Sequence, residues 1–185
     1  MAIIRAQGPS GGAAVVGRAL AHLMTRGPGA LPATGGAAAP RASQPIQLFM
    51  LKLSDITDDN FLKNAVSIGW RYLIVGAGPI AVADVKESGS GAPPRFGSLI
   101  RGSIAERLEQ AADLAARRYG AEPSTFEVRI LEIPSLYITA LWLHGPREIF
   151  IPFFEGAKQD ALAVREDPSF TQRVVRAAAL KKQSP

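Results

Sequence analysis

The chain has 185 residues, of which 47% are hydrophobic and 20% are charged, a composition typical of a globular protein with a core. It contains no cysteine, which excludes disulfides, thiolate metal sites and thiol nucleophiles. No apolar run approaches the roughly 18 residues that a membrane-spanning helix needs. The net charge is +5, and its basic residues gather at the two ends of the chain, so the central part is not expected to bind nucleic acid.

The first 44 residues differ in composition from the rest of the chain. They are rich in Ala, Gly and Pro and carry four arginines, whereas the first acidic residue is Asp55. This composition predicts a disordered basic tail, in which residues 13–25 can form one short helix. A targeting segment and a docking segment are the alternatives. We therefore expect a tail over residues 1–44, a single domain over residues 45–185, and a cytoplasmic location.

Regular alternation of apolar residues predicts the first strand of the domain at residues 46–53. Thr57, followed by two aspartates, is expected to cap a short helix that ends at Gly69. Beyond it, two β-branched runs separated by a Gly-Pro turn predict a hairpin with strands at residues 71–75 and 80–85.

The Gly, Ser and Pro residues of segment 87–97 predict a long mobile loop. The strongest helix signal follows, because the capping box of Ser103 and Glu106 precedes apolar residues at helical spacing. Gly120 supplies a left-handed stop, so we expect a helix over residues 104–119.

Three strands are expected in the centre of the domain, at residues 126–130, 136–143 and 149–153. The middle one runs for eight residues without a charge, which is typical of a strand buried on both faces. Residues 157–164 are expected to form a helical turn or two, and an Asp-Pro pair at residue 167 opens a last helix.

Strands that come in hairpin groups with helices between them predict an α+β fold rather than a doubly wound one. We expect a mostly antiparallel sheet of about five or six strands with two or three helices packed on one face. Such an arrangement leaves one face of strand 136–143, with either Trp142 or Leu141 on it, for a partner or a second copy of the chain.

Two glycine motifs resemble ligand-binding or catalytic signatures. Residues 76–81 fit the dinucleotide pattern G-x-G-x-x-A, but Pro79 removes an amide and a strand follows instead of a helix, so no cofactor is expected. Residues 8–12 fit the nucleophile-elbow pattern G-x-S-x-G. They lie in the predicted tail, and chance in a Gly-rich stretch explains them better.

The candidate catalytic residues are His144, Tyr137 and Glu148, because His144 ends the most buried strand and could form an acid–base group with the other two. A turn histidine that bonds the backbone is the alternative. The chain has only two histidines, too few for a metal site built on imidazole, so no metal is expected. Trp142 is a candidate binding residue, with a place in the core as its alternative.

Three arginines cluster around the predicted loop and the start of the following helix, where an anion can bind: Arg95, Arg101 and Arg107. A solvated face explains the same residues. The basic C-terminal residues lack a set of aromatic side chains for stacking on bases, so nucleic acid is an unlikely partner.

Two functions remain open on this evidence. The favoured one is a non-catalytic module that binds another protein or assembles with itself, since no nucleophile, phosphate loop or metal cluster stands out. The alternative is a small hydrolase or transferase that uses His144 with a nearby carboxylate.

Overall fold

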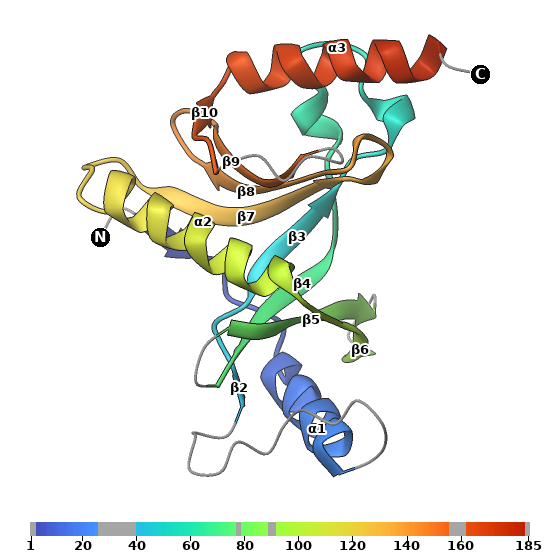
Figure 1. Cartoon of the computed structure of the whole chain (residues 1–185), viewed down its shortest axis with the longest axis vertical. Coiled ribbons are helices and arrows are strands. Elements are labelled where there is room, and N and C mark those ends of the chain that lie inside the picture. The colour runs from blue at the N-terminus through green and yellow to red at the C-terminus, as the bar shows by residue number, and fades with distance from the viewer. Residues whose placement is uncertain (1–2, 26–39, 77–78, 89–91, 156–161, 184–185) are drawn as a thin grey trace. The chain divides into compact units, whose positions relative to one another are not determined.

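A computed structural model describes residues 3–25, 40–76, 79–88, 92–155 and 162–183 (Figure 1). This part of the chain forms an α+β fold with three α-helices and ten strands in a mixed, mostly antiparallel sheet. None of the described helices is long and apolar enough to cross a membrane.

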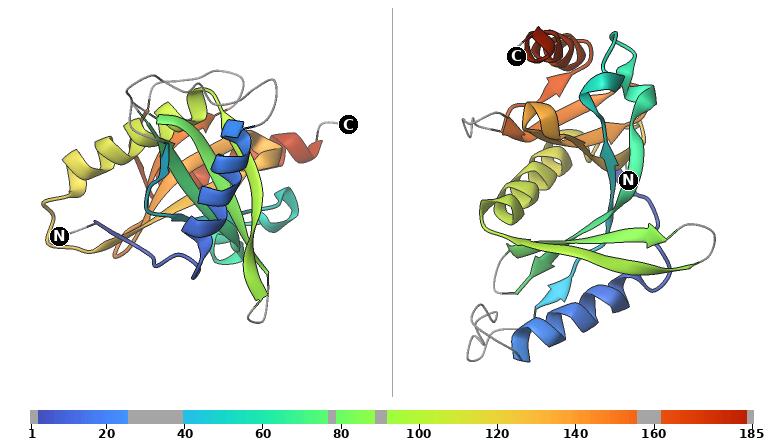
Figure 2. Two further views of the ribbon diagram at one scale, coloured as in Figure 1. Left: turned by 90° about the horizontal axis from the view of Figure 1, so that it is seen from below. Right: turned by 90° about the vertical axis from the view of Figure 1, so that its right-hand side faces the viewer.

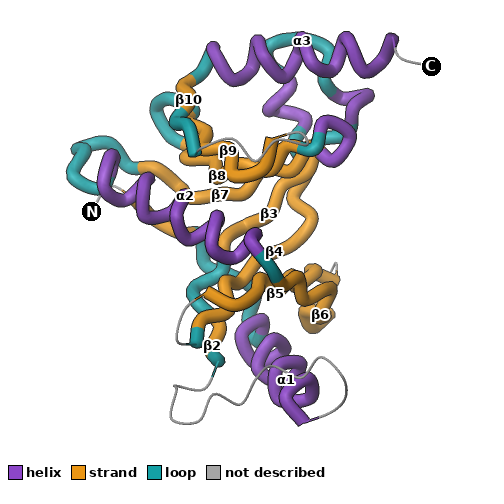
Figure 3. Tube along the Cα trace, viewed as in Figure 1, coloured by secondary structure: helices purple, strands orange, loops and turns teal. Residues whose placement is uncertain are grey.

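The three helices are α1 (Gly12–Thr25), α2 (Ser103–Tyr119) and α3 (Ser169–Gln183). The ten strands, which Figure 3 distinguishes by colour from helices and loops, are β1 (Ile3–Arg5), β2 (Arg41–Ala42), β3 (Ile46–Met50), β4 (Val66–Val75), β5 (Pro79–Ser88), β6 (Ala92–Arg101), β7 (Phe126–Ile133), β8 (Ile138–His144), β9 (Ile149–Glu155) and β10 (Arg165–Glu166).

The strand order is β10-β9-β8-β7-β3-β4-β5-β6, with β1 also paired to β7 and β2 to β4. Both β1 and β3 run parallel to β7, which makes the sheet mixed. The expected fold class and the mostly antiparallel pairing are confirmed, but the sheet has ten strands instead of the expected five or six. The strands with clear alternation, the helix at 104–119 and the last helix are confirmed within a few residues.

The helix expected between Thr57 and Gly69 is wrong. Only Phe61–Asn64 forms a 3-10 turn, and the chain enters β4 at Val66. The apolar stripe is too short to stabilise an isolated helix, and pairing with neighbouring strands overrides its local preference. Gly69 does not stop a helix but lies inside β4, where a Cβ atom would stand 2.4 Å from the carbonyl oxygen of Val85.

The mobile loop expected at residues 87–97 is also wrong where the structure describes it. Residues 92–101 form β6, which pairs antiparallel with β5 along its length. Proline is tolerated in a strand at the edge of a sheet, so Pro93 and Pro94 did not prevent this strand. The helical turns expected at residues 157–164 fall mostly outside the described residues.

The disordered tail expected over residues 1–44 is corrected for residues 3–25. Three of these residues form β1, and residues 12–25 form α1, the helix that the sequence allowed. Val16 and Leu20 are buried, so α1 packs against other parts of the chain. The proposed boundary at residue 45 concerns independent folding and stays a prediction.

The described chain divides into two compact units. The first unit comprises Met1–Ala6, Gln47–Ile68 and Gln110–Pro185, and the second comprises Gln7–Ile46 and Gly69–Glu109.

In the first unit, α3 covers one face of strands β7, β8 and β9 (Figure 1). The rings of Phe150 and Phe170 stack with their centroids 4.0 Å apart, and Phe150 also stacks on Trp142 at 6.2 Å. Val174 and Ala178 continue the apolar stripe of α3 at helical spacing. This layer buries Trp142, which is 3% exposed.

The opposite face of the same strands meets the C-terminal part of α2. Phe126 alternates with the residues that face α3, and its ring lies 6.0 Å from the ring of Tyr119. Burial raises the pKa of the Tyr119 phenol, which holds this side chain neutral. The expectation that all helices pack on one face is therefore wrong. Both faces of β8 are covered within the chain, which removes the exposed row that was expected to bind a partner.

The second unit is built on the hairpin of β5 and β6 with the greater part of β4. Helix α1 packs along this hairpin (Figure 2). A buried ion pair joins β4 to β5, because Arg71 donates from Nε and Nη2 to the two carboxylate oxygens of Asp84 at 2.7 and 2.9 Å. Ser98 on β6 donates to the same carboxylate at 3.2 Å. These bonds tie the three strands together through polar side chains.

Replacing Phe170 with Ala tests the role of α3 as the cover of the first unit. The change removes the ring that stacks on Phe150, and it is expected to lower the free energy of unfolding by about 3–5 kcal/mol. Denaturant titration followed by circular dichroism measures this. Leu180→Ala on the same helix, where the side chain is 63% exposed, is the control and should change stability by less than about 0.5 kcal/mol. Equal effects of the two changes would contradict the packing.

Candidate functional site

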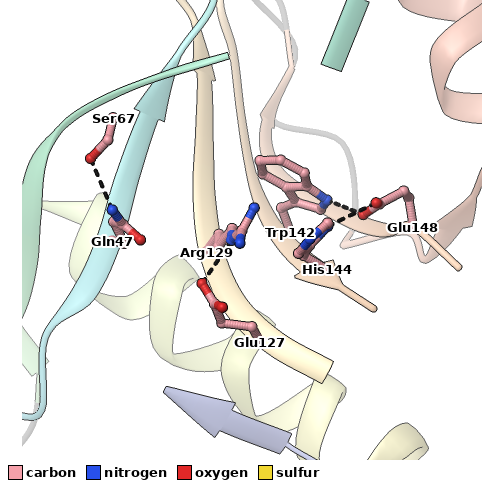
Figure 4. Close-up of polar contacts among 7 residues, drawn as sticks. All are labelled: Gln47, Ser67, Glu127, Arg129, Trp142, His144 and Glu148. Carbon is pink, nitrogen blue, oxygen red and sulfur yellow. Dashed lines mark hydrogen bonds and ion pairs between the residues drawn. The ribbon is translucent and has the colours of Figure 1, made fainter. Parts of the chain in front are cut away.

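The first unit carries a row of polar side chains on the sheet face that α3 covers further along (Figure 4). We name this row the polar strip, and its members are Gln47, Ser67, Glu127, Arg129, His144 and Glu148. The strip arises from register: Arg129 stands opposite Gln47 on β3 and Trp142 on β8, and Glu127 stands opposite His144. Directly opposed residues on neighbouring strands share a face, so these side chains gather on one side.

Arg129 is held in place from three directions. Its Nε donates to Glu127 Oε1 at 2.8 Å. Its guanidinium carbon lies 4.9 Å from the ring centroid of Phe49 and 5.0 Å from that of Trp142. Cation–π contacts on two rings together with one ion pair restrict the rotamers of a long side chain. Arg129 is therefore a fixed positive charge, with 18% of its side chain exposed.

Glu148 accepts two hydrogen bonds from the neighbouring strand. Trp142 Nε1 donates to Oε2 at 2.5 Å, and His144 Nδ1 lies 2.8 Å from Oε1. An ionised carboxylate can only accept, so the proton of a neutral His144 lies on Nδ1 and the lone pair on Nε2. The ring of His144 also meets Trp142 edge-on at 5.4 Å. The pair of His144 and Glu148 thus has the geometry of an oriented imidazole base.

Tyr137 does not join this pair. It precedes β8 at the end opposite to His144, about 20 Å away along a strand that rises about 3.3 Å per residue. It adopts a left-handed backbone conformation with φ of 54° and is 70% exposed. Of the three candidate catalytic residues, the structure brings His144 and Glu148 together and leaves Tyr137 apart.

Trp142 lies inside the core of the first unit, where Arg129 and His144 of the polar strip lie against its ring and its indole nitrogen donates to Glu148. Its ring is not available as a platform for a ligand. The side chain of His144 is 41% exposed, and that of Glu148 is 22% exposed, so the pair lies at the surface of its unit. Within the described residues, no group of three or more His, Asp and Glu side chains could hold a metal ion.

The three candidate arginines belong to the second unit. Arg95 and Arg101 lie on β6 and are exposed, whereas Arg107 lies in the first turns of α2 and is half-buried. Arg95 pairs with Lys86 across the hairpin and Arg101 pairs with Ala81. The register places Arg95 and Arg101 on opposite faces of the strand. They do not converge on one anion.

Sequence reasoning missed Arg129 and Glu127 as members of a site. Their alternation with Phe126, Val128 and Ile130 marked them as the polar side of a strand, which is correct. The pairing of that strand with β3 and β8 is what places them beside Phe49 and His144, and no local signal gives the register. Comparison of the chain with protein-family models, with curated proteins and with solved structures gives no match.

Replacing Glu148 with Ala is expected to lower the free energy of unfolding by about 1–3 kcal/mol, because the buried Trp142 N–H loses its acceptor. Chemical denaturation of the variant measures this. In a Trp142→Phe background, which has no indole N–H, the same Glu148→Ala change should cost much less.

Glu122→Ala is the control for this cycle. Its partner Arg147 is 46% exposed, and a surface ion pair of this kind contributes about 0–1 kcal/mol. If Glu148→Ala costs no more than Glu122→Ala, or costs the same with and without the indole N–H, the structural role of Glu148 is refuted.

Proposed function

We propose that the chain is a non-catalytic protein-binding module, and that it recruits an extended segment of another protein as an added strand along β6. The observation that carries this proposal is the position of β6 at the end of the strand order. Among the described residues, β5 is its one strand partner. An edge strand with unpaired peptide groups is a template for another chain.

The side chains of β6 support binding to protein. Most of its ten residues are exposed, and they include Phe96 at 36% and Ile100 at 38%. Natural sheets protect their edges with proline and bulges, and β6 has Pro93 and Pro94 near its start and a bulge around Gly97. The stretch from Arg95 to Arg101 follows the prolines and keeps all of its amides, so it is the part of β6 best suited to pair.

Charge indicates the chemistry of the partner. The strand carries Arg95 and Arg101 and no acidic residue. Because the two arginines lie on opposite faces, an added strand with an acid on each face complements both. We therefore infer an extended segment that combines acidic residues with β-branched or aromatic ones.

Pairing of β6 with a second copy of itself is less favourable. An antiparallel two-fold arrangement centred on Ser98 sets Phe96 opposite Ile100, which is attractive, but it also sets Arg95 opposite Arg101. Like charges directly opposed on neighbouring strands destabilise the pair. Self-assembly is thus the alternative outcome of the test below.

The proposal predicts that the full chain binds a fluorescent peptide of alternating Glu and Val or Ile residues, and that added salt weakens this binding. The double variant Arg95→Glu with Arg101→Glu should bind the peptide about tenfold more weakly, since two favourable cross-strand pairs become repulsive. Fluorescence anisotropy measures the affinities. Leu180→Ala, an exposed apolar change on α3, is the control that should bind as the unmodified chain does.

Two results oppose the proposal. Equal affinity of the charge-reversed variant and the control would show that β6 does not bind the peptide. A concentration-dependent dimer in light scattering, lost in an Ile100→Lys variant, would assign the edge to self-assembly.

A hydrolase or transferase remains the second candidate, because His144 Nδ1 lies 2.8 Å from Glu148 and its Nε2 is free to act as a base. The partial exposure of His144 and the distance of Tyr137 weigh against it. This hypothesis predicts that the chain hydrolyses an activated ester or phosphoester. The rate should fall at least about a hundredfold in the His144→Gln variant. An unchanged circular dichroism spectrum would separate lost chemistry from lost folding, and an equal rate in both proteins would exclude His144 as the base.

A further inference from the structure

The second unit contains a cavity at the N-terminus of α1 that the functions above do not use. Its volume is about 560 Å³. Gly8, Pro9 and Gly11 line it from the turn before the helix, Ala13 and Ala14 from the first helical turn, residues 42–45 from the connection to β3, and Tyr72 from β4. The glycine motif at residues 8–12, which the sequence assigned to chance, therefore lines one side of this open cavity.

The first turn of α1 offers free backbone donors to this cavity. Gly12 N donates to Pro9 O at 2.9 Å, and Val15 N donates to Gly11 O at 3.0 Å. The amides of Ala13 and Ala14 lie between these two and have no backbone acceptor among the described residues. Unpaired amides at the start of a 14-residue helix carry a partial positive charge, which favours an anion.

The hydroxyl of Tyr72 is a second hydrogen-bond donor at the cavity, independent of the helix amides. The residue is 2% exposed, and its hydroxyl has no hydrogen-bond partner among the described residues but is not closed off from solvent. The oxygen sits against the start of α1, since a Cβ atom added at Gly12 would lie 2.3 Å from it. The hydroxyl of this otherwise buried side chain is thus open to the cavity that Tyr72 lines, where it can donate to a bound group. Burial also raises the pKa of Tyr72, so the phenol stays protonated and can donate.

The lining and its surroundings select the charge and shape of the ligand. No acidic residue lies among the residues that line the cavity, and the chain has none before Asp55. The walls formed by Pro9, Pro45 and the alanines are apolar. We propose that this pocket binds a small organic anion, with its phosphate or carboxylate group at the amides of Ala13 and Ala14 and the Tyr72 hydroxyl, and its apolar body against the two prolines.

Two pairs of variants of the full chain test the site. Ala14→Glu puts a carboxylate in the first turn of α1, where the helix dipole favours it, so the fold is kept while an anion is repelled. Gly17→Glu is its control, because it adds the same charge one turn further along at an exposed position with open space around it. Tyr72→Phe removes only the hydroxyl, and Tyr137→Phe removes an exposed one in the other unit.

The probes are phenyl phosphate, benzoate and inorganic phosphate, and isothermal titration calorimetry measures their affinities. Phenyl phosphate and benzoate share a ring and differ in the anionic group, so their ratio identifies the preferred group. Inorganic phosphate should bind more weakly than phenyl phosphate, because it lacks the apolar body. Ala14→Glu should abolish binding, and Tyr72→Phe should weaken it about tenfold, as expected for one hydrogen bond to a charged group.

Both controls should bind as the unmodified chain does. The proposal is overturned if neither aromatic probe binds to the unmodified chain at millimolar concentration. It is also overturned if Ala14→Glu binds as tightly as Gly17→Glu, or if Tyr72→Phe binds as tightly as Tyr137→Phe.

Discussion

The first unit depends on the burial of one indole ring whose N–H group still needs an acceptor. Trp142 packs between Phe49 and Phe150 in the layer that α3 covers, and its nitrogen donates to Glu148. Burying this ring without an acceptor would cost about as much as one hydrogen bond contributes. The same carboxylate then orients His144. A packing requirement of the core therefore creates an arrangement that resembles the base of a catalytic site, and the resemblance needs no catalytic explanation.

The charges of the polar strip are satisfied by the strip and by the aromatic side chains beside it. Arg129 has Glu127 and two aromatic rings, and Glu148 has two donors. A catalytic site more often holds charged groups aimed at a substrate and a nucleophile within reach of its base. In the described residues Tyr137, the expected third member, lies at the far end of β8. The free peptide groups on which both proposals rest lie instead in the second unit, at the outer edge of β6 and at the start of α1.

Prediction from the sequence succeeded where a local pattern decided the structure. The alternation in residues 126–130 and the apolar spacing after Ser103 are visible in any short window, and both elements formed. Prediction failed where pairing between strands decided the structure. The stretch after Ala92 contains two prolines and a glycine, which indicate a loop, yet β5 offers it a complete edge. The polar strip could not be predicted, because the proximity of Arg129 to Trp142 depends on a register that a shift of one residue would destroy.

The N-terminal segment shows how composition and structure can point in different directions. Many glycines and few large apolar residues indicate disorder, because such a segment buries little surface to offset its loss of conformational entropy. In α1 the buried Val16 and Leu20 stand four residues apart, on one face of the helix. Glycine at position 12 then has a positive role, since any larger residue would collide with Tyr72. The glycine content that lowered the predicted order of this segment thus also lets the start of α1 approach the Tyr72 hydroxyl.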